Sequence, residues 1–167
     1  MKLSIYILLV FTAFGGVNLV YSSPMLKSDS LIWELNNCNV DSVKYKLLNS
    51  ILEELNENKP HEALTYANQL LVIANQSQKQ LWIAKSYYQY ASILFEVDDY
   101  ESSLFHFFKA LNIFENLNDS INQALCLNKL GLIYWKTDDV VSAKRSYFQA
   151  FDLLKNTEAE VYKPLLY

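Results

Sequence analysis

Hydrophobic residues recur at intervals of three and four positions from residue 41 onward, and no useful stretch alternates hydrophobic with polar positions. This spacing predicts amphipathic helices rather than strands. We expect helices over residues 41–57, 61–74, 78–97, 100–116, 120–136 and 140–154. Pro60 suits the first turn of the second helix, where a backbone N–H is not needed. The predicted fold class is therefore all-α.

Much of this pattern occurs twice, forty residues apart. The matching pairs are Asp98 with Asp138, Asp99 with Asp139, Ser102 with Ser142, Phe108 with Phe148 and Ala110 with Ala150. Small residues keep the same interval at Ala63, Ser103 and Ala143, and at Ala91 and Gly131. Small side chains beside large ones let antiparallel helices approach to about 8–10 Å. We therefore predict an α-solenoid of three antiparallel helix pairs, over residues 41–77, 78–117 and 118–155.

The two acidic pairs, Asp98–Asp99 and Asp138–Asp139, each stand between two predicted helices. At that position a carboxylate can accept hydrogen bonds from the free N–H groups of the next helix and favour its positive end. We expect these residues to cap helices rather than to form a catalytic carboxylate pair.

The repeated strings resemble a tetratricopeptide repeat. One string is Leu127, Leu130, Gly131, Tyr134, Ala143, Tyr147 and Ala150, and the other is Tyr87, Tyr90, Ala91, Leu94, Asp99, Tyr100, Ser103, Phe107 and Ala110. Residues 44–77 fit more loosely, through Leu47, Ile51, Ala63 and Leu70. The forty-residue period is longer than the common unit of the family. It resembles the repeats of bacterial extracytoplasmic sensor and regulator proteins.

The resemblance implies a non-catalytic scaffold that binds a protein or peptide along a concave groove, formed by the first helix of each pair. The main residues of this predicted groove are Lys85, Tyr88, Gln89, Ser92, Asn128, Lys129, Leu132 and Trp135. Its expected extensions are Tyr45, Leu48, Asn49, Leu52, Glu96 and Lys136. Rigid rings with scattered amides and cations suit recognition of a polypeptide segment. The alternative, that these are ordinary exposed helix positions, stays open because single apolar residues are normal on surfaces.

The first 22 residues have the layout of a signal peptide, with Lys2 before an apolar run and small residues near Ser22. The alternative is an uncleaved helix that anchors residues 4–20 in the inner membrane. We expect export to the periplasm or cell envelope, or secretion, and membrane contact only through this segment. Residues 23–40 are expected to cap the first helix pair, through a short helix over residues 28–38 that carries Leu31, Ile32 and Trp33.

Residues 156–167 continue the repeat, since Tyr167 stands forty positions after Leu127. We expect this segment to begin an incomplete fourth repeat or to cap the third. If the array is incomplete, the chain is the extracytoplasmic sensor part of a longer signal-transduction protein. An apolar solenoid end without a cap would also favour homo-association.

Composition argues against several other functions. The net charge is −4 and no run of five or more basic residues occurs, so we expect no nucleic-acid partner. Gly131 is the only glycine after the N-terminal segment, whereas a phosphate-binding loop needs several. His61 and His106 lack further ligands nearby in sequence, and we expect Cys38 and Cys126 to be unpaired. The sequence therefore predicts no enzyme, no cofactor and no metal site.

Overall fold

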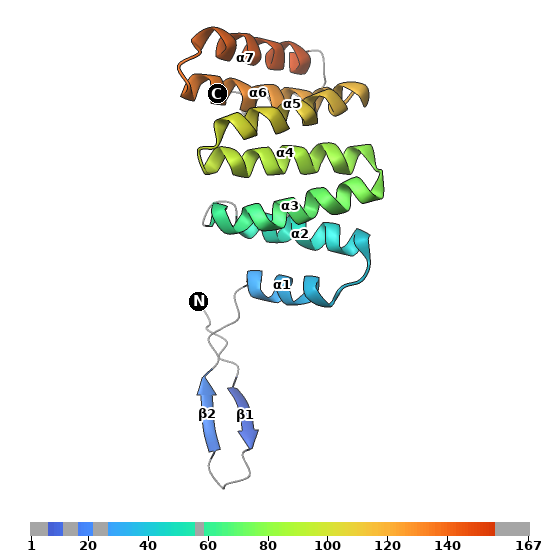
Figure 1. Ribbon diagram of the computed structural model, residues 1–167, viewed down its shortest axis with the longest axis vertical. Helices are drawn as coiled ribbons and strands as arrows, with labels where there is room; N and C mark the ends of the chain where they lie inside the picture. The colour runs from blue at the N-terminus through green and yellow to red at the C-terminus, as the bar shows by residue number, and fades with distance from the viewer. Residues whose placement is uncertain (1–6, 12–16, 22–26, 56–58, 156–167) are drawn as a thin grey trace.

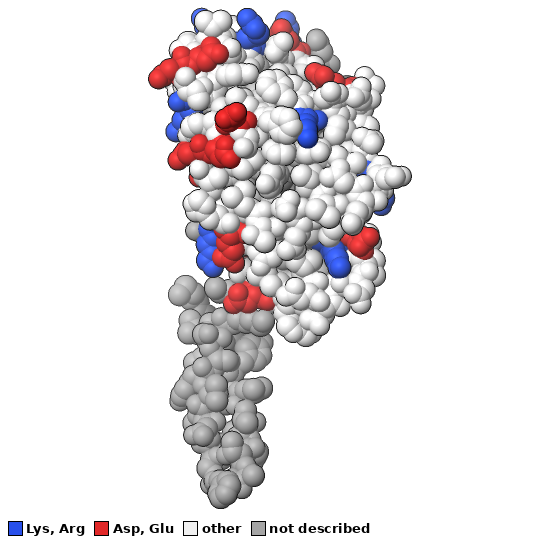
Figure 2. All heavy atoms as spheres, in the orientation of Figure 1, with Lys and Arg blue, Asp and Glu red and all other residues white. Residues whose placement is uncertain are grey.

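A computed structural model of the chain describes residues 7–11, 17–21, 27–55 and 59–155. From residue 27 it is a stack of helices (Figure 1). The helices are α1 (Lys27–Asn37), α2 (Asp41–Leu55), α3 (Pro60–Ser77), α4 (Gln80–Glu96), α5 (Tyr100–Asn116), α6 (Ser120–Lys136) and α7 (Val140–Lys155). The predicted helical solenoid is confirmed. In the view of Figure 2, charged side chains lie mostly toward the margins of the stack, and the central surface is largely uncharged.

The expected signal or anchor helix at the N-terminus is not what the structure shows. Strand β1 (Ile7–Phe11) pairs antiparallel with β2 (Val17–Tyr21), with Ile7 opposite Tyr21. Both segments are rich in β-branched and aromatic residues, which favour strands over helices. Among the described residues, no helix is both long and apolar enough to cross a membrane. Export by way of this segment stays a prediction.

A turn of one geometry joins the helices from α3 to α7. The residues Gln78, Asp98, Asn118 and Asp138 stand twenty positions apart and share a left-handed backbone, with φ between 55° and 61°. Such a residue commonly ends a helix, and Asn and Asp tolerate it better than most side chains. Each new helix then begins two residues later. The forty-residue repeat is therefore two helix-and-turn units of equal length.

The second aspartate of each predicted pair caps the following helix. Asp99 Oδ1 accepts a hydrogen bond from the Ser102 backbone N–H at 3.1 Å, and Asp139 Oδ1 accepts one from the Ser142 N–H at 3.0 Å. Asp119 caps α6 in the same way. The hydrogen bonds from Ser142 hold the pKa of the Asp139 carboxyl below its usual value. The capping prediction is confirmed, and the first aspartate of each pair supplies the left-handed turn instead.

The helices pack through small residues, as the repeat predicts. Ala63, Ser103 and Ala143 are almost wholly buried. Ser103 also donates a hydrogen bond from Oγ to the Ala91 carbonyl at 2.7 Å, which joins α5 to α4. A helix pair of this size buries little of its apolar surface within itself, so its stability depends on the neighbouring pairs.

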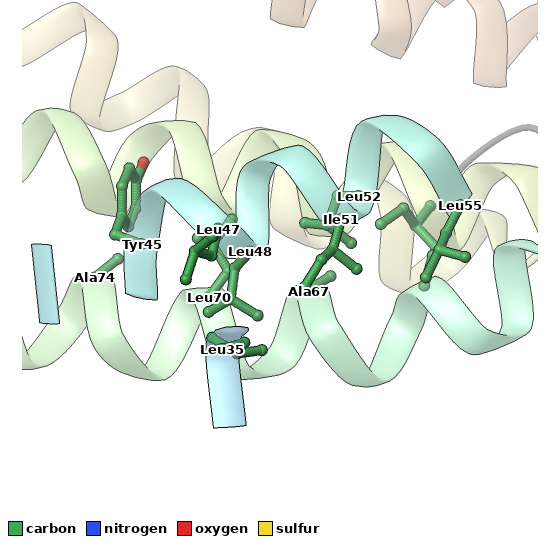
Figure 3. Packing of buried hydrophobic residues seen from close by; sticks show 12 residues of the cluster. Leu35, Tyr45, Leu47, Leu48, Ile51, Leu52, Leu55, Ala67, Leu70 and Ala74 are labelled. Carbon is green, nitrogen blue, oxygen red and sulfur yellow. The ribbon is translucent and has the colours of Figure 1, made fainter. Parts of the chain in front are cut away.

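The N-terminal end of the stack has its own hydrophobic cluster (Figure 3). Its α2 side chains face Ala67, Leu70 and Ala74 of α3, while Leu35 reaches it from α1. The expected capping helix is present as α1. However, Leu35 is its buried residue, whereas Trp33 is 64% exposed.

The Tyr147 ring of α7 lies close to the backbone of α6 at Gly131, and we predict that Gly131→Ala destabilises the fold. A Cβ at this position would lie 2.7 Å from Cε1 of Tyr147. Overpacking of this kind costs typically about 1–3 kcal/mol, which exceeds the gain of about 1 kcal/mol in helix propensity. Urea denaturation should show a net loss of about 1 kcal/mol.

The control is Tyr147→Leu, alone and combined with Gly131→Ala. Because the smaller side chain removes the clash, adding Gly131→Ala to Tyr147→Leu should not reduce stability further. Equal losses in both backgrounds would show that the Gly131–Tyr147 contact is not the cause.

Candidate partner-binding surfaces

The predicted groove residues of α4 share one face of that helix. Lys85, Tyr88, Gln89 and Ser92 follow the spacing of three, four and seven that brings side chains together on a helix. Lys85 is exposed and the other three are partly buried. Ser92 Oγ donates a hydrogen bond to the Tyr88 carbonyl at 2.9 Å, so its hydroxyl is tied to its own helix.

The predicted residues of α6, which are Asn128, Lys129, Leu132 and Trp135, extend this face. Trp135 is 59% exposed and the other three are partly buried. The ammonium group of Lys129 lies 5.8 Å from the centroid of the Phe95 ring on α4. The two helices are also in direct contact. We call the eight residues named on α4 and α6 the α4–α6 face.

The Tyr88 ring packs on the core side of the α4–α6 face and does not project from it. Its ring meets that of Phe107 edge-on, with 5.4 Å between the ring centroids. Burial raises the pKa of Tyr88 to about 12, since the charged phenolate would lose its hydration. Beside it, Oε1 of Gln89 is buried without a hydrogen-bond partner among the described residues.

The expected extension of the groove onto α2 is wrong for three residues. Tyr45, Leu48 and Leu52 are 8%, 0% and 3% exposed and belong to the N-terminal cluster. Tyr45 also stacks on Trp82 of α4, with ring centroids 4.1 Å apart and planes 9° from parallel. These side chains are core residues and are not available to a partner.

The prediction fails on α2 because the spacing between equivalent residues of α2 and α4 is not forty. The buried residues Tyr45, Leu47, Leu52 and Leu55 of α2 correspond to Ala84, Ser86, Ala91 and Leu94 of α4 at a spacing of 39, not forty. At this spacing the surface equivalents of the α4–α6 face are Lys46, Asn49, Ser50 and Glu53, all exposed or partly exposed. The face is therefore polar on α2 and becomes more apolar toward α6.

The structure also contains a cavity that sequence reasoning missed. It measures about 730 Å³ and lies between α5, α6 and α7. Its lining residues are Phe108, Leu111, Glu115, Ser120, Gln123, Leu127, Leu130, Tyr134, Ser142, Arg145, Ser146, Gln149, Asp152 and Leu153. The sequence contains one sign of this cavity. The third repeat lacks aromatic side chains that the second repeat carries forty positions earlier. We call this cavity the α5–α7 groove.

Groups that could support catalysis or metal binding are sparse in the described part of the chain. No three His, Cys, Asp or Glu residues there converge as metal ligands. Cys38 and Cys126 are free thiols. Burial raises the pKa of the Cys126 thiol, so it is poorly suited to act as a nucleophile.

The raised pKa of Tyr88 predicts a loss of stability at alkaline pH. An ordinary tyrosine ionises near pH 10 in the unfolded chain, whereas Tyr88 stays protonated in the fold up to about pH 12. The unfolded state therefore releases its proton first as the pH rises. This contribution to stability, on the order of 2 kcal/mol, is complete below pH 10 and is lost between about pH 10 and 12.

Denaturation at several pH values would measure this effect, with Tyr88→Phe as the variant. Tyr88→Phe should lose less stability than the native chain over that interval, with Tyr147→Phe as a control in a less buried tyrosine. Identical pH profiles for the native chain and Tyr88→Phe would contradict the assignment of the raised pKa to Tyr88.

Comparison with known proteins supports the repeat architecture. Residues 82–156 match a family model of the tetratricopeptide repeat. No curated protein matches the chain. The crystal structure of BtubC (BKLC) from P. vanneervenii is similar, with 15% identity, a TM-score of 0.68 and coverage of 80% of this chain. The chain spans 55% of that protein's length, and the likeness concerns the fold alone. Residues 82–156 of this chain therefore carry tetratricopeptide repeats.

Proposed function

We propose that the chain is an exported, non-catalytic scaffold that binds a protein or peptide partner through the α4–α6 face. Tetratricopeptide repeats generally mediate protein–protein interaction, and residues 82–156 carry such repeats. The face combines two cations, two amides and apolar side chains on two helices that are in contact. This mixture suits a polypeptide better than a small molecule, which requires an enclosed site with convergent polar groups.

The single observation that carries the proposal is the exposure of Trp135. Its side chain is 59% exposed at one end of the α4–α6 face, on the same side of α6 as Asn128 and Leu132. A large ring in water gains most when a partner covers it, and tryptophan is enriched among the residues that dominate interface energies. Trp135 is therefore the expected anchor of the interface.

Two further parts of the proposal concern location and assembly. Export rests on the signal-like layout of residues 1–22. The alternative, a sensor portion of a longer signal-transduction protein, would use the same face and differ only in what the binding controls. Homo-association through the C-terminal end has one supporting feature, the exposure of Val141, Phe148 and Phe151 on α7. Residues 156–167 lie outside the described residues.

We predict that Trp135→Ala weakens partner binding without destabilising the fold. Because the ring is largely exposed, stability should change by no more than about 0.5 kcal/mol. Recovery of the partner from the native envelope fraction should fall, and the affinity for the recovered partner should weaken at least about tenfold. Quantitative pull-down and titration of the purified pair would measure both effects.

Trp33→Ala is the matched control, since Trp33 is 64% exposed but lies on α1, away from the α4–α6 face. It should leave binding unchanged. If Trp33→Ala and Trp135→Ala weaken binding equally, or neither does, the α4–α6 face is not the interface.

A further inference from the structure

The α5–α7 groove is a surface separate from the α4–α6 face. Successive residues of a helix turn by about 100°, so Leu127, Leu130 and Tyr134 lie on the side of α6 roughly opposite Asn128 and Leu132. The groove has α6 as its floor and α5 and α7 as its walls. A ligand held there would not compete with one bound to Trp135.

In the preceding repeat, the equivalent space is filled by rings. His106 of α5 stacks on Tyr87 of α4 at 5.6 Å between ring centroids, and it meets Tyr90 edge-on at 4.9 Å. Phe105 packs edge-on against His106 at 5.2 Å. Lys109 covers the cluster, with Nζ 4.3 Å from the centroid of the Phe105 ring. The ring contacts of His106 with Tyr87 and Tyr90 join α5 to α4.

We call Tyr87, Tyr90, Phe105, His106 and Lys109 the plug residues of the second repeat. The third repeat lacks them. Forty residues on from Tyr87, Tyr90, Phe105, His106 and Lys109, the chain carries Leu127, Leu130, Arg145, Ser146 and Gln149. All five of these residues line the α5–α7 groove. The turn within each repeat is alike, with a left-handed Asp98 or Asp138 followed by a capping Asp99 or Asp139. The groove therefore arises from smaller side chains on a repeated backbone, and not from an irregular backbone.

The lining of the groove has a definite arrangement. Leu111, Leu127 and Leu130 give it an apolar base. Its exposed charged residues are Arg145 and Asp152 on the α7 wall and Glu115 on the α5 wall. Arg145 forms no ion pair with any described residue. Glu115 occupies the position on α5 that Lys155, forty residues later, occupies on α7. Lys155 stands ten residues after Arg145. At the helical rise, the charges of Arg145 and Glu115 are thus about 15 Å apart along the groove.

We propose that the α5–α7 groove binds an extended peptide segment of a partner protein, with an acidic residue at Arg145, a basic residue at Glu115 and apolar residues between them. Four steps of extended chain cover about 13 Å, which long charged side chains extend to the required span. Side chains two and four of such a segment face the leucines, and side chains one and five face the rim. Because Arg145 is basic and Glu115 and Asp152 are acidic, the groove favours this class of ligand over a lipid, which carries its charge at one end. This site is additional to the function proposed above.

The test uses the full chain and a defined probe, the pentapeptide acetyl-Glu-Leu-Ser-Leu-Lys-amide, together with versions that carry Phe or Tyr in place of Leu. Isothermal titration should give a dissociation constant below about 1 mM for at least one of these peptides. The matched peptide acetyl-Glu-Leu-Ser-Leu-Glu-amide should bind at least about tenfold more weakly, because its second acid would face Glu115.

Two variants of the protein locate the binding. The first restores the plug of the preceding repeat through Leu127→Tyr, Leu130→Tyr and Ser146→His, and it should weaken binding at least about tenfold while circular dichroism stays helical. The second is Arg145→Glu, which should weaken binding of the original peptide and strengthen that of acetyl-Lys-Leu-Ser-Leu-Lys-amide. Lys144→Tyr on α7, at an exposed position outside the groove, is the control and should change nothing.

Several outcomes would overturn the proposal. One is that no pentapeptide binds the native chain, and another is that neither the plug variant nor Arg145→Glu alters binding. Binding that occurs only after deletion of residues 156–167 would assign the groove to the chain's own C-terminal segment. Binding that separates a dimer, measured by light scattering, would assign it to a second copy. The proposal is supported if the plug variant loses peptide binding and Arg145→Glu changes the peptide preference as predicted above.

Discussion

The close approach of successive helices at small buried residues is the constraint on which the structure depends. Where Tyr147 lies against Gly131, and where the Ser103 hydroxyl bonds to the Ala91 carbonyl, a larger side chain would push two helices apart. Each helix pair exposes an apolar side that the next pair covers. A local change in helix spacing would therefore alter the surfaces on both sides of the stack. The helix spacing that stabilises the fold therefore also shapes the proposed binding surfaces.

The regular turns explain how one scaffold can present two different surfaces. Left-handed residues stand every twenty positions between α3 and α7, and aspartates cap α5, α6 and α7, so these helices repeat at a regular interval. Side chains that point away from the core are then free to differ between repeats. On one side of α6 they form a face that ends in an exposed tryptophan, and on the other they leave a groove where the neighbouring repeat has rings. Both proposed binding surfaces arise from these differences between repeats.

Sequence periodicity was sufficient to predict the helices, the capping role of Asp99 and Asp139, and the tetratricopeptide repeat family. It failed where the period changes. The connection after α2 lacks the regular twenty-residue spacing, so Leu48 and Leu52 were assigned to a groove although they lie in the core. It also does not account for the strands at residues 7–11 and 17–21, where a signal or anchor helix is expected from the apolar run but β-branched and aromatic residues favour strands. The α5–α7 groove was missed because a search for repeated residues does not detect a cavity caused by unrepeated ones.

The most direct test of the central claim is the folding of one helix pair in isolation. Residues 118–155, which contain α6 and α7, would be prepared as a separate peptide and compared with the full chain by circular dichroism during urea denaturation. If each pair depends on its neighbours, the peptide should be largely unfolded and should show no cooperative transition, while the full chain unfolds cooperatively. A peptide that is as helical as the intact repeat, with a transition of its own, would contradict the claim.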